Sequence, residues 1–329
     1  MESFHIFADN MKRVIKTTMA LFAFLAATGV EAPAKDVLLP YGDMNRWTIR
    51  KIHESAVIGG NTKTLYEIGP NRTIDGNKPY VNGGGSPWAT SNVMAKVMGV
   101  VKTNNSVYRE RRGSGYCAKL TTHIEKVKVI GLFNINVLAA GSMYLGSMRE
   151  PISGTKDGVK AMNCGIRFNQ RPKALKFDYQ VHVANSPSRI KLTGFSKRKT
   201  VPGKDCAVAV LLLQKRTEDG NGNITAKRVG TMVVRFSKST NGWVNNATYD
   251  IMYGDIRNNP RYDASTMKLR SSDYALNSKG KSVLVKETGW AVAGETPTHM
   301  VLQFASSHGG AFIGSPGNTL WVDNVRLVY

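Results

Sequence analysis

The stretch KALKFDYQVHV, residues 173–183, alternates apolar and polar side chains along its whole length. One face of the stretch would carry Leu175, Phe177, Tyr179, Val181 and Val183. The other face would carry Lys176, Asp178, Gln180 and His182. A period of two residues is that of a β-strand with one face buried and the other in water. The stretch therefore predicts a half-buried strand of an antiparallel sheet.

The stretches around it carry further strand signals. Residues 206–216, CAVAVLLLQKR, open with a continuous apolar run, which is typical of a central strand covered on both faces. Residues 229–238 follow after the turn signal DGNG, so the two stretches predict a hairpin with an extended loop. Residues 298–307 and 319–329 predict two more strands, and residues 126–148 predict two strands around a central break.

The composition favours an all-β fold. Of the 329 residues, 32 are glycine and only 21% are charged, which suits short strands joined by turns better than helices. No long stretch after residue 34 has a helical period. Many short strands with long loops between them predict a jelly-roll β-sandwich.

The closing stretch GSPGNTLWVDNVRLVY, residues 314–329, contains one acidic side chain, Asp323. Strict alternation would give one face of this strand the members Trp321, Asp323, Val325, Leu327 and Tyr329. On so apolar a face the carboxylate needs a partner. We expect a backbone N–H or a calcium ion there rather than a catalytic role.

The N-terminal residues have the pattern of an export signal. Its parts are a positive region at Lys12, Arg13 and Lys16, an apolar core at residues 19–27 and a small-residue cleavage site at residues 32–34. The apolar core is too short to cross a membrane as a helix. We expect a cleavable signal peptide in residues 1–34, with Met11 as the true start. The exported protein would be periplasmic, cell-surface or secreted, and no later stretch predicts a transmembrane segment.

The chain has a candidate division near residue 80. Residues 81–88, VNGGGSPW, have the composition of a hinge. We expect residues 35–80 to form an N-terminal strand or extension packed on the main domain, and residues 81–329 to form the sandwich. The sequence leaves open whether residues 35–80 are a separate small domain, and it does not predict the oligomeric state.

The three cysteines are Cys117, Cys164 and Cys206, and their odd number leaves at least one thiol unpaired within the chain. Cys117 and Cys206 stand in apolar, strand-like surroundings. Cysteines in such surroundings usually behave as small buried hydrophobes. Buried free thiols are therefore favoured over a disulfide or a nucleophile, although the sequence does not exclude a disulfide.

The chain is strongly basic, with 45 Lys and Arg against 23 Asp and Glu and a formal net charge of +22. The basic residues are spread along the chain, and no zinc-finger spacing, basic zipper or RNA-recognition motif accompanies them. Charge without such a motif indicates non-specific attraction to anions. We expect an acidic glycan or an anionic surface as a partner, and no specific nucleic acid.

Two stretches combine an indole with side-chain amides and hydroxyls. They are GGGSPWATSN, residues 83–92, and STNGWVNNATY, residues 239–249. A flat indole stacks on the face of a sugar ring while amides bind its hydroxyls. The candidate carbohydrate-binding residues are Trp88, Asn92, Trp243, Asn245 and Trp290. For any single tryptophan, the alternative is a place at the rim of the core.

A metal site is a second expectation. If the first and last strands of the sandwich pair, Asp43 and Asn45 of the stretch YGDMNRW would approach Asp323. Oxygen ligands of this kind suit calcium, which takes six to eight of them. A structural calcium at Asp43, Asn45 and Asp323 is thus a hypothesis, and the alternative is that these side chains satisfy nearby backbone groups. No other cofactor is indicated.

Hydrolysis of a glycosidic bond would require two carboxyl groups in one cleft, about 5–9.5 Å apart. The acidic candidates are Asp178, Asp250, Asp255, Glu287 and Glu295, none of which stands in a recognisable pairing motif. The stretch SSHGG, residues 306–310, lacks the strand–turn–helix motif of a serine hydrolase and is better explained as a loop. The sequence assigns no catalytic residue.

Several stretches occur together in an order that resembles a known family. The most specific are RPKALKFDY, residues 171–179, and the closing run GGAFIGSPGNTLWVDNV, residues 309–325. From about residue 80 onward the chain resembles the putative carbohydrate-metabolism domain family of secreted Bacteroidota proteins. That resemblance implies a jelly roll similar in shape to galactose-binding-like modules, and a role in glycan use outside the cytoplasm.

The family resemblance implies no catalytic pair, although members have been called putative glycoside hydrolases. We therefore weigh three hypotheses. The favoured one is an exported, non-catalytic carbohydrate-binding protein. The alternatives are a glycoside hydrolase that uses two of the acids above, and a structural or adhesive surface protein.

Overall fold

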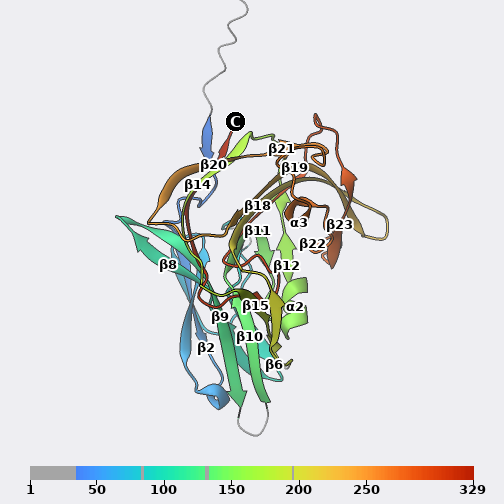
Figure 1. The fold of residues 1–329 in the computed structure, drawn as a ribbon. Coiled ribbons are helices and arrows are strands. Elements are labelled where there is room, and N and C mark those ends of the chain that lie inside the picture. Colours follow the sequence, from blue (N-terminus) through green and yellow to red (C-terminus); the bar gives the residue numbers. More distant parts are fainter. Residues whose placement is uncertain (1–34, 83–84, 130–132, 195) are drawn as a thin grey trace, which may run out of the picture. The chain divides into compact units, whose positions relative to one another are not determined.

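The computed structural model describes residues 35–82, 85–129, 133–194 and 196–329, and its ribbon is drawn in Figure 1. The predicted signal peptide lies outside the described residues. Residues 36–329 form one compact unit that is almost entirely β-structure. Among the described residues, no helix is both long and apolar enough to span a membrane.

Eight long strands form the centre of this unit. They are β9 (Gly115–Val129), β11 (Ser142–Met148), β14 (Ala174–His182), β18 (Ala207–Glu218), β19 (Ile224–Phe236), β20 (Val244–Asp250), β24 (His299–Ala305) and β26 (Thr319–Val328). The first sheet has the order β9-β26-β14-β20, and the second sheet has the order β11-β24-β18-β19. Counted along the chain, these orders are first-eighth-third-sixth and second-seventh-fourth-fifth. This is the strand order of a jelly roll, so the predicted fold is confirmed.

The two sheets pack face to face over one apolar core. Leu175, Phe177 and Val181 of β14 are buried, and the ring of Phe177 meets that of Phe304 from the second sheet at 5.0 Å between centroids. Leu320 and Val322 of β26 belong to the same core. The alternation that predicted β14 thus reflects a strand with one face in this core. The other predicted strands are confirmed as β18, β19, β24 and β26.

The closing strand β26 does not alternate strictly, which corrects the predicted face of Asp323. Asn324 has a left-handed backbone (φ 53°), and the register between β14 and β26 shifts between Lys176 and Asp178. One extra residue in β26 therefore forms a β-bulge, which moves every later side chain to the opposite face. Val325 and Leu327 lie in the core, whereas Asp323 pairs across the sheet with Asp178 on the outer face.

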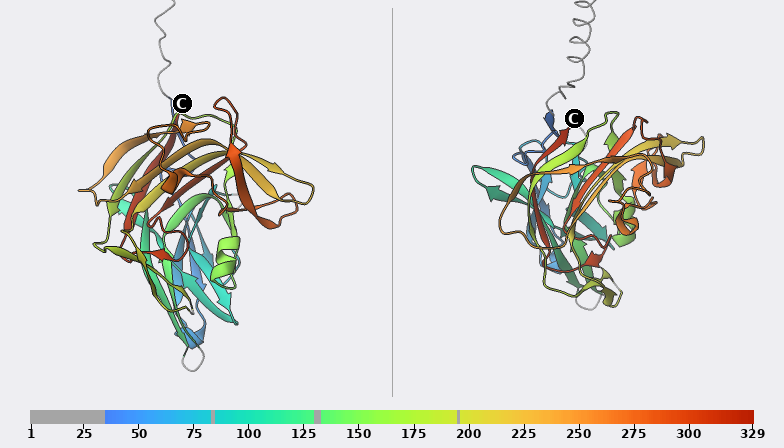
Figure 2. Two further views of the ribbon diagram at one scale, coloured as in Figure 1. Left: turned by 45° about the vertical axis from the view of Figure 1, so that its right-hand side comes forward. Right: turned by 45° about the horizontal axis from the view of Figure 1, so that its top comes forward.

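Additional strands widen both sheets. The first sheet gains β1 (Asp36–Leu38), β8 (Val107–Arg112), β10 (Phe133–Ala140) and β16 (Thr193–Gly194). The second gains β5 (Trp88–Thr90), β12 (Met162–Cys164), β13 (Ile166–Arg167), β21 (Met252–Tyr253), β22 (Tyr274–Leu276) and β23 (Ser282–Trp290). Figures 1 and 2 show β9 and β10 as a long green hairpin that extends away from the strands around β18.

Smaller elements cover the sandwich. They are a sheet of β2 (Trp47–His53), β3 (Thr62–Ile68) and β4 (Arg72–Asp75), a hairpin of β6 (Val93–Val97) and β7 (Val100–Asn104), and a sheet of β15 (Ser188–Lys191), β17 (Lys199–Pro202) and β25 (Ile313–Gly314). The helical segments are η1 (Ala56–Ile58), α2 (Thr155–Lys160) and α3 (Ala264–Met267).

The N-terminal segment joins the sandwich directly. β1 pairs antiparallel with β26, and Met44 and Trp47 are fully buried in the main core. The indole N–H of Trp47 donates to the carbonyl of Met44 at 2.6 Å. Residues 36–80 thus share their core with the jelly roll, while the proposed division near residue 80 stays a prediction.

The thiols of Cys117, Cys164 and Cys206 are all buried and free. Burial raises the pKa of Cys117 and of Cys164 to about 12. Both thiols are therefore protonated at neutral pH, as expected for cysteines that act as small core residues.

Candidate functional site

A cluster centred on Arg112 lies on the outer face of the first sheet. Arg112 ends β8, and its Nη1 donates to Asp323 Oδ2 at 2.6 Å and to Asp178 Oδ2 at 2.9 Å. Its Nη2 donates to Asn245 Oδ1 at 2.6 Å. The guanidinium also stacks on the indole of Trp243, with its carbon 3.9 Å from the ring centroid. We call these five residues the Arg112 cluster.

Local structure explains why these side chains meet. The alternation of β14 sends Asp178 away from the core, and the alternation of β26 before the bulge does the same for Asp323, since Leu320 and Val322 lie in the core. Asn324 Nδ2 also donates to Asp178 Oδ2 at 2.8 Å, so the bulge residue itself joins the two strands. Trp243 directly precedes β20, which is the neighbour of β14 in the sheet. The site thus depends on three adjacent strands and on the end of β8.

The stacking on Trp243 fixes a ring that remains partly in solvent. Trp243 is half-buried, whereas Asn245 beside it is exposed. A guanidinium over an indole contributes about 0.5–2 kcal/mol and restricts the ring orientation. The cluster therefore presents an ordered indole edge next to a side-chain amide.

A second half-buried indole, Trp321, lies on the same outer face. Across the sheet, Trp321 stands between Lys119 of β9 and Gln180 of β14. Its indole N–H donates to Glu110 Oε1 at 2.7 Å, and the ammonium of Lys119 lies 5.5 Å from the centre of its ring. Two indoles flanked by polar side chains thus share one sheet face.

The two carboxylates of the cluster experience opposite pKa shifts. Burial raises the pKa of Asp178, but hydrogen bonds from the Asn246 N–H, Asn324 and Arg112 outweigh burial, so the pKa lies below its usual value. Burial raises the pKa of Asp323, and the bonds from Arg112 and the Asn324 N–H offset this only in part. Because one guanidinium binds both groups, neither carboxylate is free to bind a substrate.

Two of the five predicted sugar-binding residues are interior. Trp88 has no exposed surface, and its indole N–H donates to the carbonyl of Pro40 at 2.8 Å. Asn92 is 1% exposed, and its Oδ1 accepts from the N–H groups of Ser106 and Val107. Neither side chain offers a surface to a glycan, since both hold the inside of the fold together.

Trp290 lies apart from the Arg112 cluster, at the end of β23. It lines a surface hollow of about 620 Å³ together with Asp255, Arg257 and Thr288. Asp255 is paired with Arg257 at 2.6 Å, and Tyr262 packs edge-on against the indole. The hollow has an aromatic wall but only one carboxylate in its lining.

The three predicted calcium ligands each have a partner within the protein. Asn45 Nδ2 lies 3.4 Å from Asp43 Oδ2, and Asn45 Oδ1 accepts from the Tyr116 N–H at 2.9 Å. Asp323 is instead bound by Arg112. Across the described part of the chain, no group of three or more His, Cys, Asp or Glu side chains could hold a metal ion. The calcium hypothesis stays an untested prediction.

Other predicted acids are paired with basic residues one by one. Asp250 binds Arg261 at 3.0 Å on the surface, and Glu295 binds Lys215. Glu287 is buried with Arg228, and its Oε1 accepts from Gln214 Nε2 at 2.7 Å.

The loop after β24 is held by a carboxylate from another segment, that of Asp205, which lies just before β18. Asp205 Oδ1 accepts from Ser307 Oγ at 2.9 Å, and Asp205 Oδ2 accepts from the Ser315 N–H at 2.7 Å. This carboxylate thereby holds the SSHGG loop in place, which agrees with its interpretation as a loop.

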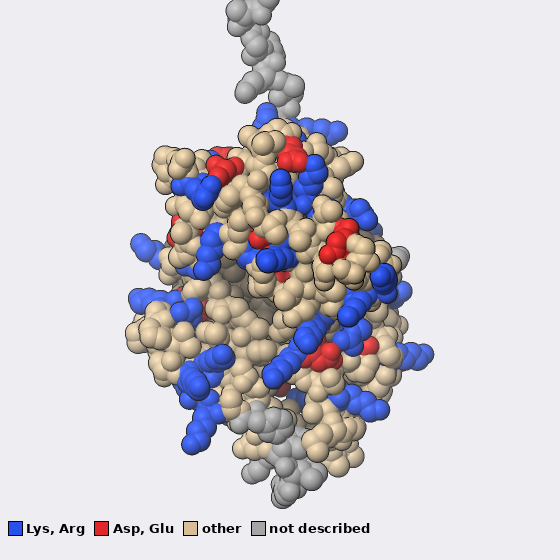
Figure 3. All heavy atoms as spheres, turned by 90° about the vertical axis from the view of Figure 1, so that its right-hand side faces the viewer, with Lys and Arg blue, Asp and Glu red and all other residues tan. Residues whose placement is uncertain are grey.

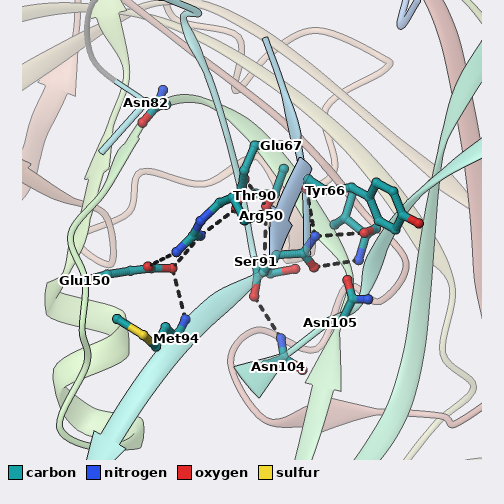
Figure 4. A network of polar contacts seen from close by, with 12 residues as sticks. Arg50, Tyr66, Glu67, Asn82, Thr90, Ser91, Met94, Asn104, Asn105 and Glu150 are labelled. Carbon is teal, nitrogen blue, oxygen red and sulfur yellow. Dashed lines mark hydrogen bonds and ion pairs between the residues drawn. The ribbon is translucent and has the colours of Figure 1, made fainter. Parts of the chain in front are cut away.

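A second arginine–carboxylate group, drawn in Figure 4, lies in the interior. Arg50 of β2 binds Glu67 of β3 at 3.0 Å and forms two bonds to Glu150, which follows β11. Thr90 donates to Glu67 Oε2 at 2.8 Å, and the Met94 N–H donates to Glu150 Oε1 at 3.0 Å. We call Arg50, Glu67 and Glu150 the interior triad. It ties the N-terminal sheet to the sandwich.

Sequence reasoning named Trp243, Asn245, Asp178 and Asp323 but assigned them to three separate hypotheses, and it missed Arg112. The signal for Arg112 was weak, because it stands in a run of basic residues beside a turn. Only the pairing of β8 with β9 brings it over the sheet.

Comparison with known proteins gives a family match. The model of the family described as "putative carbohydrate metabolism domain" matches residues 66–328. No curated protein matches the chain. One similar solved structure is a putative glycoside hydrolase from Bacteroides thetaiotaomicron VPI-5482, with 17% identity over 86% of this chain and 71% of that chain and a TM-score of 0.45. Another, from Bacteroides vulgatus ATCC 8482, is also described as a putative glycoside hydrolase, with 14% identity, coverage of 89% and 94%, and a TM-score of 0.38.

Proposed function

The chain belongs to the putative carbohydrate metabolism domain family, and we propose that it is an exported, non-catalytic glycan-binding protein. The proposed binding surface is the outer face of the first sheet around Trp243, Asn245 and Trp321. The observation that carries the proposal is the stacking of Arg112 on Trp243, which orders an indole beside an exposed amide.

The surface has the chemistry that sugars require. An indole covers the apolar face of a pyranose ring, while amide and charged groups bind its hydroxyls. Gln180 stands beside Trp321 on the same face, and Asn245 stands close to Trp243. Two aromatic contacts on an open sheet face suit an extended glycan rather than a single enclosed sugar.

An acidic glycan is the preferred class. Arg109 and Arg111 stack on the ring of Tyr116 at 4.5 and 5.0 Å, in the hairpin that carries Arg112. Arg326 Nη1 reaches Asn246 Oδ1 at 3.3 Å on the same sheet. Cations held by aromatic and amide groups can still pair with sulfate or uronate groups.

Glycoside hydrolysis is the second candidate function. It is favoured by the adjacent carboxylates Asp178 and Asp323, whose pKa values shift in opposite directions, as those of an acid and a base would. Their shared bond to Arg112 argues against it, because hydrolysis needs one carboxyl group free to donate a proton and the other free to attack or to activate water.

A glycan array with the full chain tests the proposal, using neutral, sulfated and uronic-acid glycans. Trp243→Ala and Trp321→Ala should each weaken binding about fivefold, in line with about 1 kcal/mol per aromatic contact. Trp290→Ala is the matched control, since Trp290 is also half-buried but lies in another hollow. Absence of binding to every glycan would refute the proposal.

Two further experiments test the hydrolase alternative and the calcium hypothesis. Release of reducing sugar that is abolished by both Asp178→Asn and Asp323→Asn would favour the hydrolase. Repeating the array with a calcium chelator tests the proposed calcium at Asp43, Asn45 and Asp323, because loss of binding on chelation would support it.

A further inference from the structure

A cavity of about 860 Å³ lies on the opposite side of the sandwich from the Arg112 cluster, against the outer face of the second sheet. Its walls are β6 and β7, β9 and β10, the region around α2, and the ends of β11 and β24. Several of these elements lie on the right of Figure 1, the side that Figure 3 turns to the viewer. That face is hollowed, and lysine and arginine side chains border the hollow in Figure 3.

Two hairpins present apolar faces to this cavity. In the β9–β10 hairpin, Val127 pairs with Ile135 and Glu125 pairs with Val137, and all four line the cavity. Leu138 of the same hairpin also lines the cavity, and it packs against Ile190 and Leu192. A protein does not usually leave a strand face of this composition uncovered without a use for it.

The β6–β7 hairpin forms the second wall in the same manner. Val97 pairs with Val100 and Ala95 pairs with Lys102, and all four line the cavity. The volume lies within the range of pockets that enclose small organic ligands, about 300–1,000 Å³. Two apolar hairpin faces with space between them therefore form a binding cavity for an apolar body.

The cavity also has a polar end. Asn104 lines it, and its Oδ1 is buried without a hydrogen-bond partner among the described residues. Its Nδ2 is already bound to Ser91 O at 2.8 Å. Glu125 lies nearby in the lining and shares the ammonium of Lys102 with the buried Glu54, at 3.5 and 3.0 Å. The charged side chains of the lining are balanced, with Lys102 and Lys156 against Glu125 and Asp157, so an uncharged head group fits beside Glu125 better than a carboxylate does.

One wall residue is held under backbone strain. Phe312 lines the cavity with φ 65°, a left-handed conformation that bulky residues rarely adopt. The carbonyl of Phe312 accepts from the Leu192 N–H at 3.1 Å, which fixes the segment beside β10. Strain of this kind persists where surrounding structure enforces it, often at ligand-binding walls.

We propose that this cavity binds a single-chain amphiphile, an alkyl or acyl chain with an uncharged, hydroxyl-bearing head group. The chain lies between the β6–β7 and β9–β10 hairpins. The head group lies at the polar end of the cavity, beside Asn104 and Glu125. This activity is independent of the glycan-binding surface.

Displacement of the fluorescent probe N-phenyl-1-naphthylamine from the full chain tests the proposal. The probe should brighten on binding, and 1-monolauroylglycerol should displace it at about tenfold lower concentration than laurate, whose carboxylate would face Glu125. Val137→Trp and Ala139→Trp fill the cavity and should each weaken displacement at least about tenfold. Leu276→Trp is the control, because Leu276 is 48% exposed and lies outside the cavity.

Thermal unfolding and glycan binding of each variant show whether it is folded. Glu125→Gln removes the charge that opposes a carboxylate, and in a folded protein it should abolish the preference for monolauroylglycerol over laurate. A probe that does not brighten, or folded tryptophan variants that bind as the parent does, would overturn the cavity assignment. Tighter binding of laurate than of monolauroylglycerol would overturn the head-group assignment.

Discussion

The interior triad and the Arg112 cluster use the same chemistry at different depths. Each places one guanidinium between two carboxylates from separate segments of the chain. The side chains of Arg50, Glu67 and Glu150 are 1–4% exposed, whereas Arg112 is 19% exposed. The interior group is surrounded by the Met94 N–H, Thr90 and the ring of Tyr80, and the surface group by an indole and amides. Depth therefore decides whether such a group fixes a fold or presents a surface.

The largest expected effect is on the interior triad. Arg50→Met leaves two buried carboxylates without a counter-ion, and breaking a buried ion pair costs about 3–5 kcal/mol in the free energy of unfolding. Urea unfolding would measure this cost. The triple variant with Glu67→Gln and Glu150→Gln removes the uncompensated charges and should recover much of the loss. A cost below about 1 kcal/mol would place the triad with ordinary surface ion pairs.

The matched change at the surface should separate stability from binding. Arg112→Met should cost less, about 1–3 kcal/mol of unfolding free energy, because Asp178 and Asp323 are buried but keep hydrogen bonds from Asn324 and from the Asn246 N–H. It should weaken glycan binding about tenfold or more, since Trp243 loses the guanidinium that orders its ring. The two are measured by urea unfolding and by binding to the best glycan of the array. Unchanged binding in the folded variant would argue that the cluster is structural, like its interior counterpart.

A smaller effect is expected at the bulge that positions the surface cluster. Asn324→Ala must keep φ 53° with a side chain that disfavours it, and it loses the bond to Asp178. We expect a loss of about 1–2 kcal/mol. Asn324→Gly loses the same bond but accepts the conformation, so it should cost less. Equal costs in thermal unfolding would mean that the backbone conformation of this residue contributes nothing.

The most subtle effect is on pH dependence. Burial raises the pKa of Glu67 to about 7, against a usual value of 4.5. Between these two values the native state binds more protons than the unfolded state, so the free energy of unfolding should fall as the pH rises through this window. Glu67→Gln cannot titrate, so the melting temperature of the parent should fall relative to that of the variant as the pH rises through this window. A difference independent of pH would contradict the raised pKa.

The positions of the strands could be predicted from the sequence because they depend on local alternation. β14 and β24 each have one face in the core, and their patterns show it directly. The face of Asp323 could not be predicted in the same way. One left-handed residue, Asn324, reverses the alternation, and the sequence around it still reads as a regular strand.

The candidate site was predicted in fragments. Trp243 and Asn245 were recognised from an indole next to amides, and Asp323 was recognised as an acid that needs a partner. Their common partner, Arg112, is distant in sequence from all three, and no local pattern distinguishes it from Arg109 or Arg111. Trp88 and Asn92 offer the same combination of an indole and an amide as Trp243 and Asn245, yet packing placed them inside.

By itself, the sequence determined the all-β character, most of the sandwich strands and the membership of a carbohydrate-related family, because these depend on periodicity and on motifs of contiguous residues. The tertiary structure alone decided which arginine meets which carboxylate, which tryptophans reach the surface and where a cavity remains. Those outcomes depend on strand pairing between residues far apart in the chain. The free energy of such contacts is set by burial and register, which no single stretch contains.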